Sequence, residues 1–154
     1  MQVLKAVESV NESQKHLLFR KLTDLCNGKL EGKVVALWGL AFKPETDDMR
    51  EATSLVMIDL LVKSGCKVRV YDPAAMNECR RRVGNVVEYA GDMYEAVQNA
   101  DALIMLTEWQ EFRMPNWSRV GKAMNGNIVI DGRNIYDVKE MREAGFEYSC
   151  IGRK

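Results

Sequence analysis

Three cationic side chains in two loops of this sequence could bind a phosphorylated ligand. Lys43 and Arg50 follow the apolar run 34–38, and Arg133 lies in the segment DGRN. Arginine and lysine form charge-assisted hydrogen bonds with phosphate oxygens, so two or three of them around one crevice are typical of a diphosphate site. The competing interpretation is that each is a solvated loop charge without a ligand.

The first two cations belong to a loop between an expected strand and an expected helix. Residues 34–38, VVALW, form an apolar and partly β-branched run that predicts a buried strand. Gly39 follows it, and the absence of a Cβ atom allows a tight turn there. A helical pattern then begins at Glu51. In an open α/β sheet, a loop in this position lies where ligands bind.

Strand-like and helix-like segments alternate along the rest of the chain. This alternation predicts an α/β fold with a doubly wound, mainly parallel, Rossmann-like sheet of about six strands. Right-handed crossovers favour the strand order 3-2-1-4-5-6, in which the loops after strands one, four and five converge. Their shared rim would carry Lys43, Arg50, Trp109 and Arg133. The expected strands are 34–38, 67–71, 86–89, 102–106, 128–130 and 147–151, and the expected helices are 51–64, 75–82, 92–98, 116–124 and 137–144.

The turn after the first strand is not a dinucleotide fingerprint. The segment GLA at 39–41 keeps only a fragment of GxGxxG, and Pro44 stands where a glycine would let a pyrophosphate approach the backbone. Asp72 follows the second strand as a ribose-binding acid would, but it precedes a proline and is better interpreted as a turn residue. We therefore expect a nucleotide held by side chains, not an NAD-binding domain.

A long amphipathic helix is expected before the α/β region. Apolar residues recur at steps of three and four from Val3 to Leu25, and Gly28 is suited to end the helix. The apolar stripe begins almost at Met1 without an N-cap residue, which suggests a chain cut from something longer. The stripe is expected to pack on the core, and part of it could contact another domain or subunit.

Composition argues against several classes of function. Lys plus Arg equals Asp plus Glu at 22 each, so no net field attracts nucleic acid or an anionic membrane. No apolar run approaches the ~20 residues that span a bilayer. The lone histidine, His16, is expected at the surface. The four cysteines, Cys26, Cys66, Cys79 and Cys150, lack metal-ligand spacing and are expected to be free, mostly buried thiols of a cytoplasmic protein.

Four motifs, in order, resemble the C-terminal domain of the UDP-glucose 6-dehydrogenases. They are GLAFKPETDDMREATSL at 39–55, VYDP at 70–73, LTEWQEF at 106–112 and DGRNIYD at 131–137, and the leading VNESQK at 10–15 resembles the end of that family's central dimerisation helix. The resemblance implies the end of this helix over 1–28 and a UDP-sugar-binding α/β domain over 29–154. It also implies oxidation of UDP-glucose to UDP-glucuronate with two NAD, through a covalent thiohemiacetal and thioester on a cysteine.

The resemblance also implies roles for individual residues. Phe42 and Lys43 would contact the UDP-sugar, and Arg133 would reach the nucleotide from the neighbouring loop. Arg50 would cross an interdomain cleft to NAD, which is bound mainly by an N-terminal domain outside this chain. Trp109 could either pack or contact the ligand.

Two acids beside Arg50 are expected to fix its loop. Asp47 and Asp48 could do so by capping the following helix or by orienting Arg50. None of the four cysteines stands in the nucleophile context of the family, so no catalytic residue is expected here and the chain as given should be inactive. The full-length protein would be a homodimer or higher homo-oligomer.

Other assignments remain open at this stage. The same domain could belong to a dehydrogenase of UDP-N-acetylhexosamine or of GDP-mannose, although TEW and DGRNIYD favour glucose. The chain could also be a stand-alone, non-catalytic nucleotide-binding module, or a structural assembly domain that binds no nucleotide.

Overall fold

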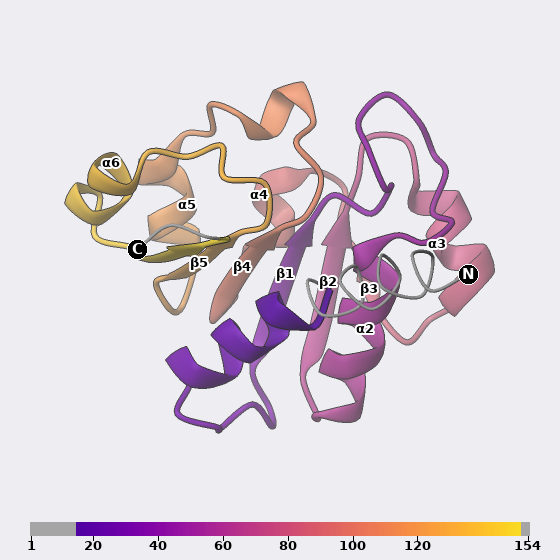
Figure 1. Ribbon diagram of the computed structural model, residues 1–154, viewed down its shortest axis with the longest axis horizontal. Helices are drawn as coiled ribbons and strands as arrows, with labels where there is room; N and C mark the ends of the chain where they lie inside the picture. Colours follow the sequence, from indigo (N-terminus) through magenta and orange to yellow (C-terminus); the bar gives the residue numbers. More distant parts are fainter. Residues whose placement is uncertain (1–14, 152–154) are drawn as a thin grey trace, which may run out of the picture.

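The computed structural model describes residues 15–151, which form a six-stranded sheet between two layers of helices (Figure 1). Neighbouring strands are all parallel, in the order β3-β2-β1-β4-β5-β6, so the predicted fold class and strand order are confirmed. The strands are β1 (Val34–Trp38), β2 (Lys67–Tyr71), β3 (Glu88–Tyr89), β4 (Ala102–Met105), β5 (Ile128–Asp131) and β6 (Glu147–Cys150). The helices are one over 15–25, α2 (Thr53–Lys63), α3 (Met76–Val83), α4 (Met93–Ala96), the 3₁₀ turn η1 (Gln110–Phe112), α5 (Trp117–Ala123) and α6 (Val138–Glu143).

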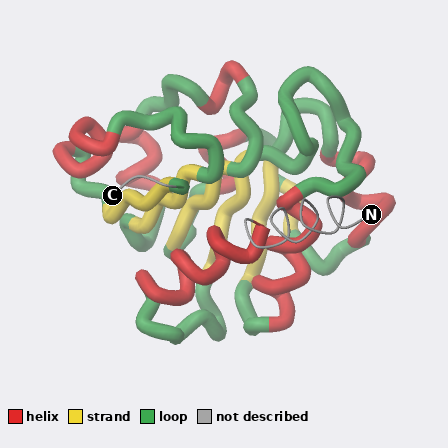
Figure 2. The backbone as a smooth tube through the Cα atoms, viewed as in Figure 1, coloured by secondary structure: helices red, strands yellow, loops and turns green. Residues whose placement is uncertain are grey.

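Alternate residues of the central strands face two separate hydrophobic cores. Leu37 and Ile104 belong to a core with the helix over 15–25, α2 and α3. Trp38 and Leu103 belong to a core with α4, α5 and α6 on the other face. Figure 2 shows these helices on the two sides of the sheet. Because β1 and β4 are covered on both faces, they read as continuous apolar runs and not as alternating ones.

The helix over 15–25 packs directly on the sheet. Leu18 and Leu22 are buried in the same core as α2, as the apolar stripe predicted. The earlier part of the expected helix, 1–14, lies outside the described residues. In the part of the chain from 15 to 151, no helix has the length and apolar character needed to cross a membrane.

Most elements differ from their expected bounds by one or two residues at an end, and for two of them the structure shows a physical reason. The helix expected from Glu51 begins at Thr53, because Glu51 has a left-handed backbone (φ 59°) that an α-helix cannot include. The third strand covers only Glu88–Tyr89, at the edge of the sheet, where it pairs with β2 alone. Both differences lie outside the central strands that position the site.

Candidate functional site

The loops after β1, β4 and β5 meet at the carboxyl edge of the sheet, which is uppermost in Figure 1. β1 and β4 are neighbours, but the chain continues from β1 to β2 and from β4 to β5, in opposite directions across the sheet. Ligands of open α/β sheets bind at such a switch point. A cavity of about 310 Å³ lies beside it, lined by Lys15, Leu18, Phe42, Glu51, Thr53, Leu106, Gly132, Arg133 and Ile151.

Arg133 joins the three loops to one another. Its Nε donates to the carbonyl oxygen of Leu106 and its Nη2 donates to the carbonyl oxygen of Phe42, both at 2.8 Å. The Oε2 atom of Glu108 lies 3.5 Å from Nε. The two carbonyls occupy two of the five N–H groups of the guanidinium, which leaves three for an anion. The side chain is therefore held in position and still able to bind a ligand.

Asp131, the last residue of β5, shapes the loop that carries Arg133. Its buried carboxylate accepts hydrogen bonds from the backbone N–H groups of Arg133, Ile135 and Tyr136 and from the Tyr148 hydroxyl. Burial, together with the hydrogen bond to Asp131, raises the pKa of Tyr148, so the phenol stays protonated as a donor at neutral pH. The DGRN segment thus combines a structural acid with an arginine that lines the cavity.

Phe42 and Lys43 belong to the β1 loop, and Phe42 lies at this cavity. The Phe42 side chain lines the cavity and is 38% exposed, which is unusual for a phenylalanine. Lys43 is exposed, and its Nζ lies 5.3 Å from the centroid of the Phe42 ring. The sequence predicted that these two residues lie near Arg133. The structure shows this for Phe42, whose carbonyl oxygen accepts from Arg133, whereas Lys43 is not part of the cavity lining; the contacts of both with a ligand stay predictions.

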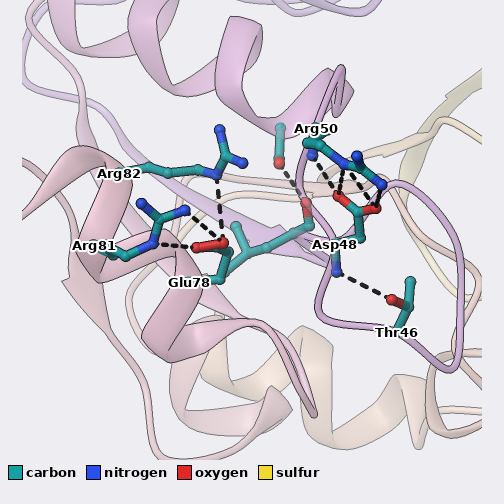
Figure 3. Close-up of polar contacts among 8 residues, drawn as sticks. Thr46, Asp48, Arg50, Glu78, Arg81 and Arg82 are labelled. Atoms are coloured by element: carbon teal, nitrogen blue, oxygen red, sulfur yellow. Dashed lines mark hydrogen bonds and ion pairs between the residues drawn. The ribbon is translucent and has the colours of Figure 1, made fainter.

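Arg50 does not line the cavity, and it pairs with Asp48. Its Nε lies 3.1 Å from each carboxylate oxygen of Asp48, and its Nη2 donates to Oδ2 at 2.8 Å (Figure 3). The Arg50 side chain is 80% exposed. The expectation that Asp48 orients Arg50 is therefore confirmed. The alternative, a helix cap by Asp47 or Asp48, is wrong, because the N-cap of α2 is Ala52 and no side chain caps it.

Asp72 makes the densest set of polar contacts at this edge of the sheet. Its buried Oδ2 accepts hydrogen bonds from the backbone N–H groups of Leu40 and Ala41 and from the indole N–H of Trp109. Its Oδ1 accepts from the N–H groups of Ala74 and Ala75. Asp72 is the expected turn residue, but it also occupies the N–H groups of the β1 turn, where a dinucleotide fold would hold a pyrophosphate.

Trp109 is a core residue and not a rim residue. The side chain is buried among the residues packed under α4 and α5, and its indole N–H is used by Asp72. Of the two roles that the sequence left open for it, the structure supports packing. The expectation that Trp109 lies on the rim with the cations is wrong, because its indole N–H donates to the buried carboxylate of Asp72 and the ring is buried with it.

Gly39 allows the β1 and β4 loops to touch. Its backbone is left-handed (φ 97°), and a Cβ atom built there would lie 2.5 Å from the Cβ of Thr107. Thr107 in turn donates a hydrogen bond from its hydroxyl to the carbonyl oxygen of Ala41. The glycine therefore serves close packing between loops and not the approach of a phosphate.

Sequence reasoning missed three polar residues of the cavity wall. Lys15 comes from the helix over 15–25, Glu51 ends the β1 loop, and Thr53 begins α2. None of them stands in a spacing that indicates a ligand. The apolar stripe contains Leu18, one turn after Lys15, and could have suggested that this face of the helix packs toward the sheet and its loops; Leu18 is indeed buried.

The described residues do not assemble a metal centre or an activated thiol. Across 15–151, no group of three or more His, Cys, Asp and Glu side chains could hold a metal ion. All four cysteines are free and three are buried, as expected. Burial raises the pKa of Cys26 and Cys79 and raises that of Cys66 to about 11, so these thiols stay protonated at neutral pH.

The contacts of Asp72 predict a large loss of stability on Asp72→Asn. The amide would present an NH₂ group to N–H donors, leaving buried groups unpaired, and we expect a loss of about 2–4 kcal/mol in the free energy of unfolding. Urea denaturation measures it. Asp59→Asn, which removes an exposed carboxylate paired with Lys63, is the matched control and should change stability by about 0.5 kcal/mol or less. Equal effects for the two variants would contradict the assignment of Asp72.

The pairing of Asp48 with Arg50 predicts a low titration point for this carboxyl. The hydrogen bonds from Arg50 lower the pKa of Asp48 from its ordinary value of 3.8 to about 2. A lowered pKa means that the contact is intact above pH 3.8 and is lost as the pH falls through about 2. Carboxyl NMR titration should give about 2 for this group. Arg50→Ala should return it toward 3.8, whereas Lys43→Ala should not; no response to Arg50→Ala would refute the pairing.

Comparison with known proteins agrees with this arrangement. Residues 36–138 match the model of the UDP-glucose/GDP-mannose dehydrogenase family, UDP binding domain. The chain is 45% identical to a UDP-glucose 6-dehydrogenase of Pseudomonas aeruginosa over 157 aligned residues, which cover 99% of this chain and 35% of that protein. It is 38% identical to the UDP-glucose 6-dehydrogenase TuaD of Bacillus subtilis, covering 98% of this chain and 32% of the relative.

Solved structures of nucleotide-sugar dehydrogenases also superpose on this chain. A UDP-glucose dehydrogenase of Pyrobaculum islandicum superposes with a TM-score of 0.77 at 33% identity, over 94% of this chain and 31% of that one. An NDP-N-acetyl-D-galactosaminuronic acid dehydrogenase of Methanosarcina mazei superposes with a TM-score of 0.78 at 31% identity, over 92% and 29%. The chain thus spans about a third of the length of the relatives it matches. It belongs to the UDP-glucose/GDP-mannose dehydrogenase family and corresponds to the UDP-binding domain of that family.

Proposed function

We propose that this chain is the UDP-sugar-binding part of an NAD-dependent UDP-glucose 6-dehydrogenase. The observation that carries the proposal is Arg133, whose guanidinium is held by two backbone carbonyls and lines a cavity at the switch point of the sheet. In this position it can give three N–H groups to a diphosphate. The carboxylates of Asp72 and Asp131 are both occupied by protein donors and do not compete for it, and Glu108 approaches the guanidinium at Nε, the atom that already donates to Leu106.

In this proposal Phe42 and Lys43 complete the contact with the UDP-sugar. The exposed ring of Phe42 offers an apolar surface beside the charges, and Lys43, whose Nζ lies 5.3 Å from the centroid of that ring, adds an exposed cation next to it. Both residues precede the Asp48–Arg50 pair in the same loop. Glucose is the favoured sugar because the relatives of 45% and 38% identity are UDP-glucose 6-dehydrogenases.

In this proposal NAD binds mainly to another part of the enzyme. The N–H groups of Leu40 and Ala41 donate to Asp72 and are therefore not available to donate to a phosphate, so the β1 turn of this chain does not fit a dinucleotide. Arg50 is proposed to reach the cofactor across a domain boundary, and its exposed guanidinium leaves room for this. The catalytic nucleophile, a cytoplasmic location and a homodimeric or larger assembly belong to the same proposal and are supported by family resemblance alone.

Calorimetric titration with UDP tests the proposal. We expect weak binding to the chain, because only part of the ligand's enclosure is present. Arg133→Ala and Lys43→Ala should each weaken it by about 1.5–3 kcal/mol, since each removes charge-assisted hydrogen bonds. Absence of heat at millimolar UDP would refute the site.

Arg50→Ala is the matched control for this titration. It removes a cation from the same loop. Neither Arg50 nor Lys43 is part of the cavity lining, but Arg50 is held by Asp48, whereas Lys43 lies beside the ring of Phe42, which does line the cavity. UDP affinity should therefore change little. A loss equal to that of Lys43→Ala would mean that Arg50 serves the UDP site, and would contradict its assignment to the cofactor.

A further inference from the structure

A second cation enters the cavity from outside the three loops. Lys15, on the helix over 15–25, lines the cavity together with Arg133, and its side chain is only 11% exposed. Its Nζ lies 3.5 Å from the Oε2 atom of Glu51. A largely buried ammonium group is costly unless an anion accompanies it, and Glu51 is such an anion.

Glu51 is a partner that can be exchanged at low cost. Its side chain is 91% exposed, so its carboxylate is solvated by water once it leaves Lys15. An ion pair with one such exposed member contributes about 1 kcal/mol or less. The left-handed backbone of Glu51 separates it from α2, and the side chain lies at the cavity wall without being part of the helix.

The charges of the cavity wall favour an anionic ligand over the bound carboxylate. Lys15 and Arg133 contribute two positive charges to the lining, and Glu51 contributes one negative charge; Glu108, which is outside the lining, pairs with Arg133 through Nε at 3.5 Å. A diphosphate group carries more negative charge than one carboxylate and offers several acceptor oxygens to both cations at once. Exchange of Glu51 for such a group would thus increase the charge-assisted contacts of both cations.

We infer that Lys15 is a ligand-binding residue of this site and that Glu51 competes with the ligand's phosphate groups for it. The inference rests on the proposed UDP site and assigns it a further cation, from the helix that precedes the α/β sheet. It also assigns Glu51 a role in specificity: ligands with too little negative charge do not displace the carboxylate.

Calorimetric titration of UDP into single variants tests the two roles separately. Glu51→Gln should tighten UDP binding about two- to fivefold, because the competing carboxylate is gone. Lys15→Gln should weaken it about tenfold. In the double variant, the gain from Glu51→Gln should disappear, since the carboxylate no longer has a cation to occupy. A merely structural ion pair would not produce this combination, in which the two single variants change UDP affinity in opposite directions and the double variant loses the gain.

The pair Lys63 and Asp59 on α2 gives matched controls. Lys63→Gln and Asp59→Asn remove one charge each from an exposed ion pair outside the cavity, and neither should change UDP affinity. Thermal unfolding of each variant identifies any loss of folding, and Lys15→Met retains the aliphatic packing of the helix face if Lys15→Gln is unstable.

The outcomes separate this inference from the proposed function. If UDP binds and Arg133→Ala weakens it while Lys15→Gln and Glu51→Gln leave it unchanged, the inference is wrong and the UDP site stands. Weaker binding by Glu51→Gln would likewise overturn the competition. If UDP does not bind the unaltered chain at all, both the proposed function and this inference fail.

Discussion

The buried carboxylate of Asp72 is the contact on which the ligand-binding edge of this sheet depends. It accepts hydrogen bonds from five N–H groups, those of Leu40, Ala41, Ala74, Ala75 and Trp109, and so connects the loops that follow β1, β2 and β4. A buried anion is tolerated only when it is fully hydrogen-bonded, and the same condition fixes the positions of its donors. One consequence is structural and the other is chemical: the loops are held together, and the amide groups of the β1 turn are no longer open to a phosphate.

A second buried acid does the same for the remaining loop. Asp131 accepts hydrogen bonds from backbone N–H groups of the segment that follows β5, and this segment carries Arg133. The carboxylates of Asp72 and Asp131 are therefore internal, whereas Phe42, Lys43, Arg50 and Arg133 project from the loops that these two acids hold. With the amides of the β1 turn occupied by Asp72, the side chains of these loops are the groups left for a phosphate, which is the basis of the proposed function.

The fold was predictable because its signals are local and consistent. Apolar runs such as 34–38, glycine turns and capping acids such as Asp92 and Asp137 place the elements, and the handedness of crossovers sets the strand order. The meeting of the loops that carry Phe42 and Arg133 followed from that order. Trp109 and Lys15 were not predictable in the same way. The position of the Trp109 side chain depends on an acid 37 residues away, and the contact of Lys15 with Glu51 depends on how a helix docks on the sheet. Hydrophobic periodicity predicts local elements and not contacts between residues far apart in the sequence, such as these two.

The central claim is that side chains, and not the β1 turn, hold the nucleotide. A crystal structure of the chain with UDP tests it most directly. The account predicts diphosphate oxygens within hydrogen-bonding distance of the Arg133 guanidinium, with Asp72 still accepting the N–H groups of Leu40 and Ala41. A diphosphate bound to those two N–H groups, with the Asp72 carboxylate displaced, would contradict it.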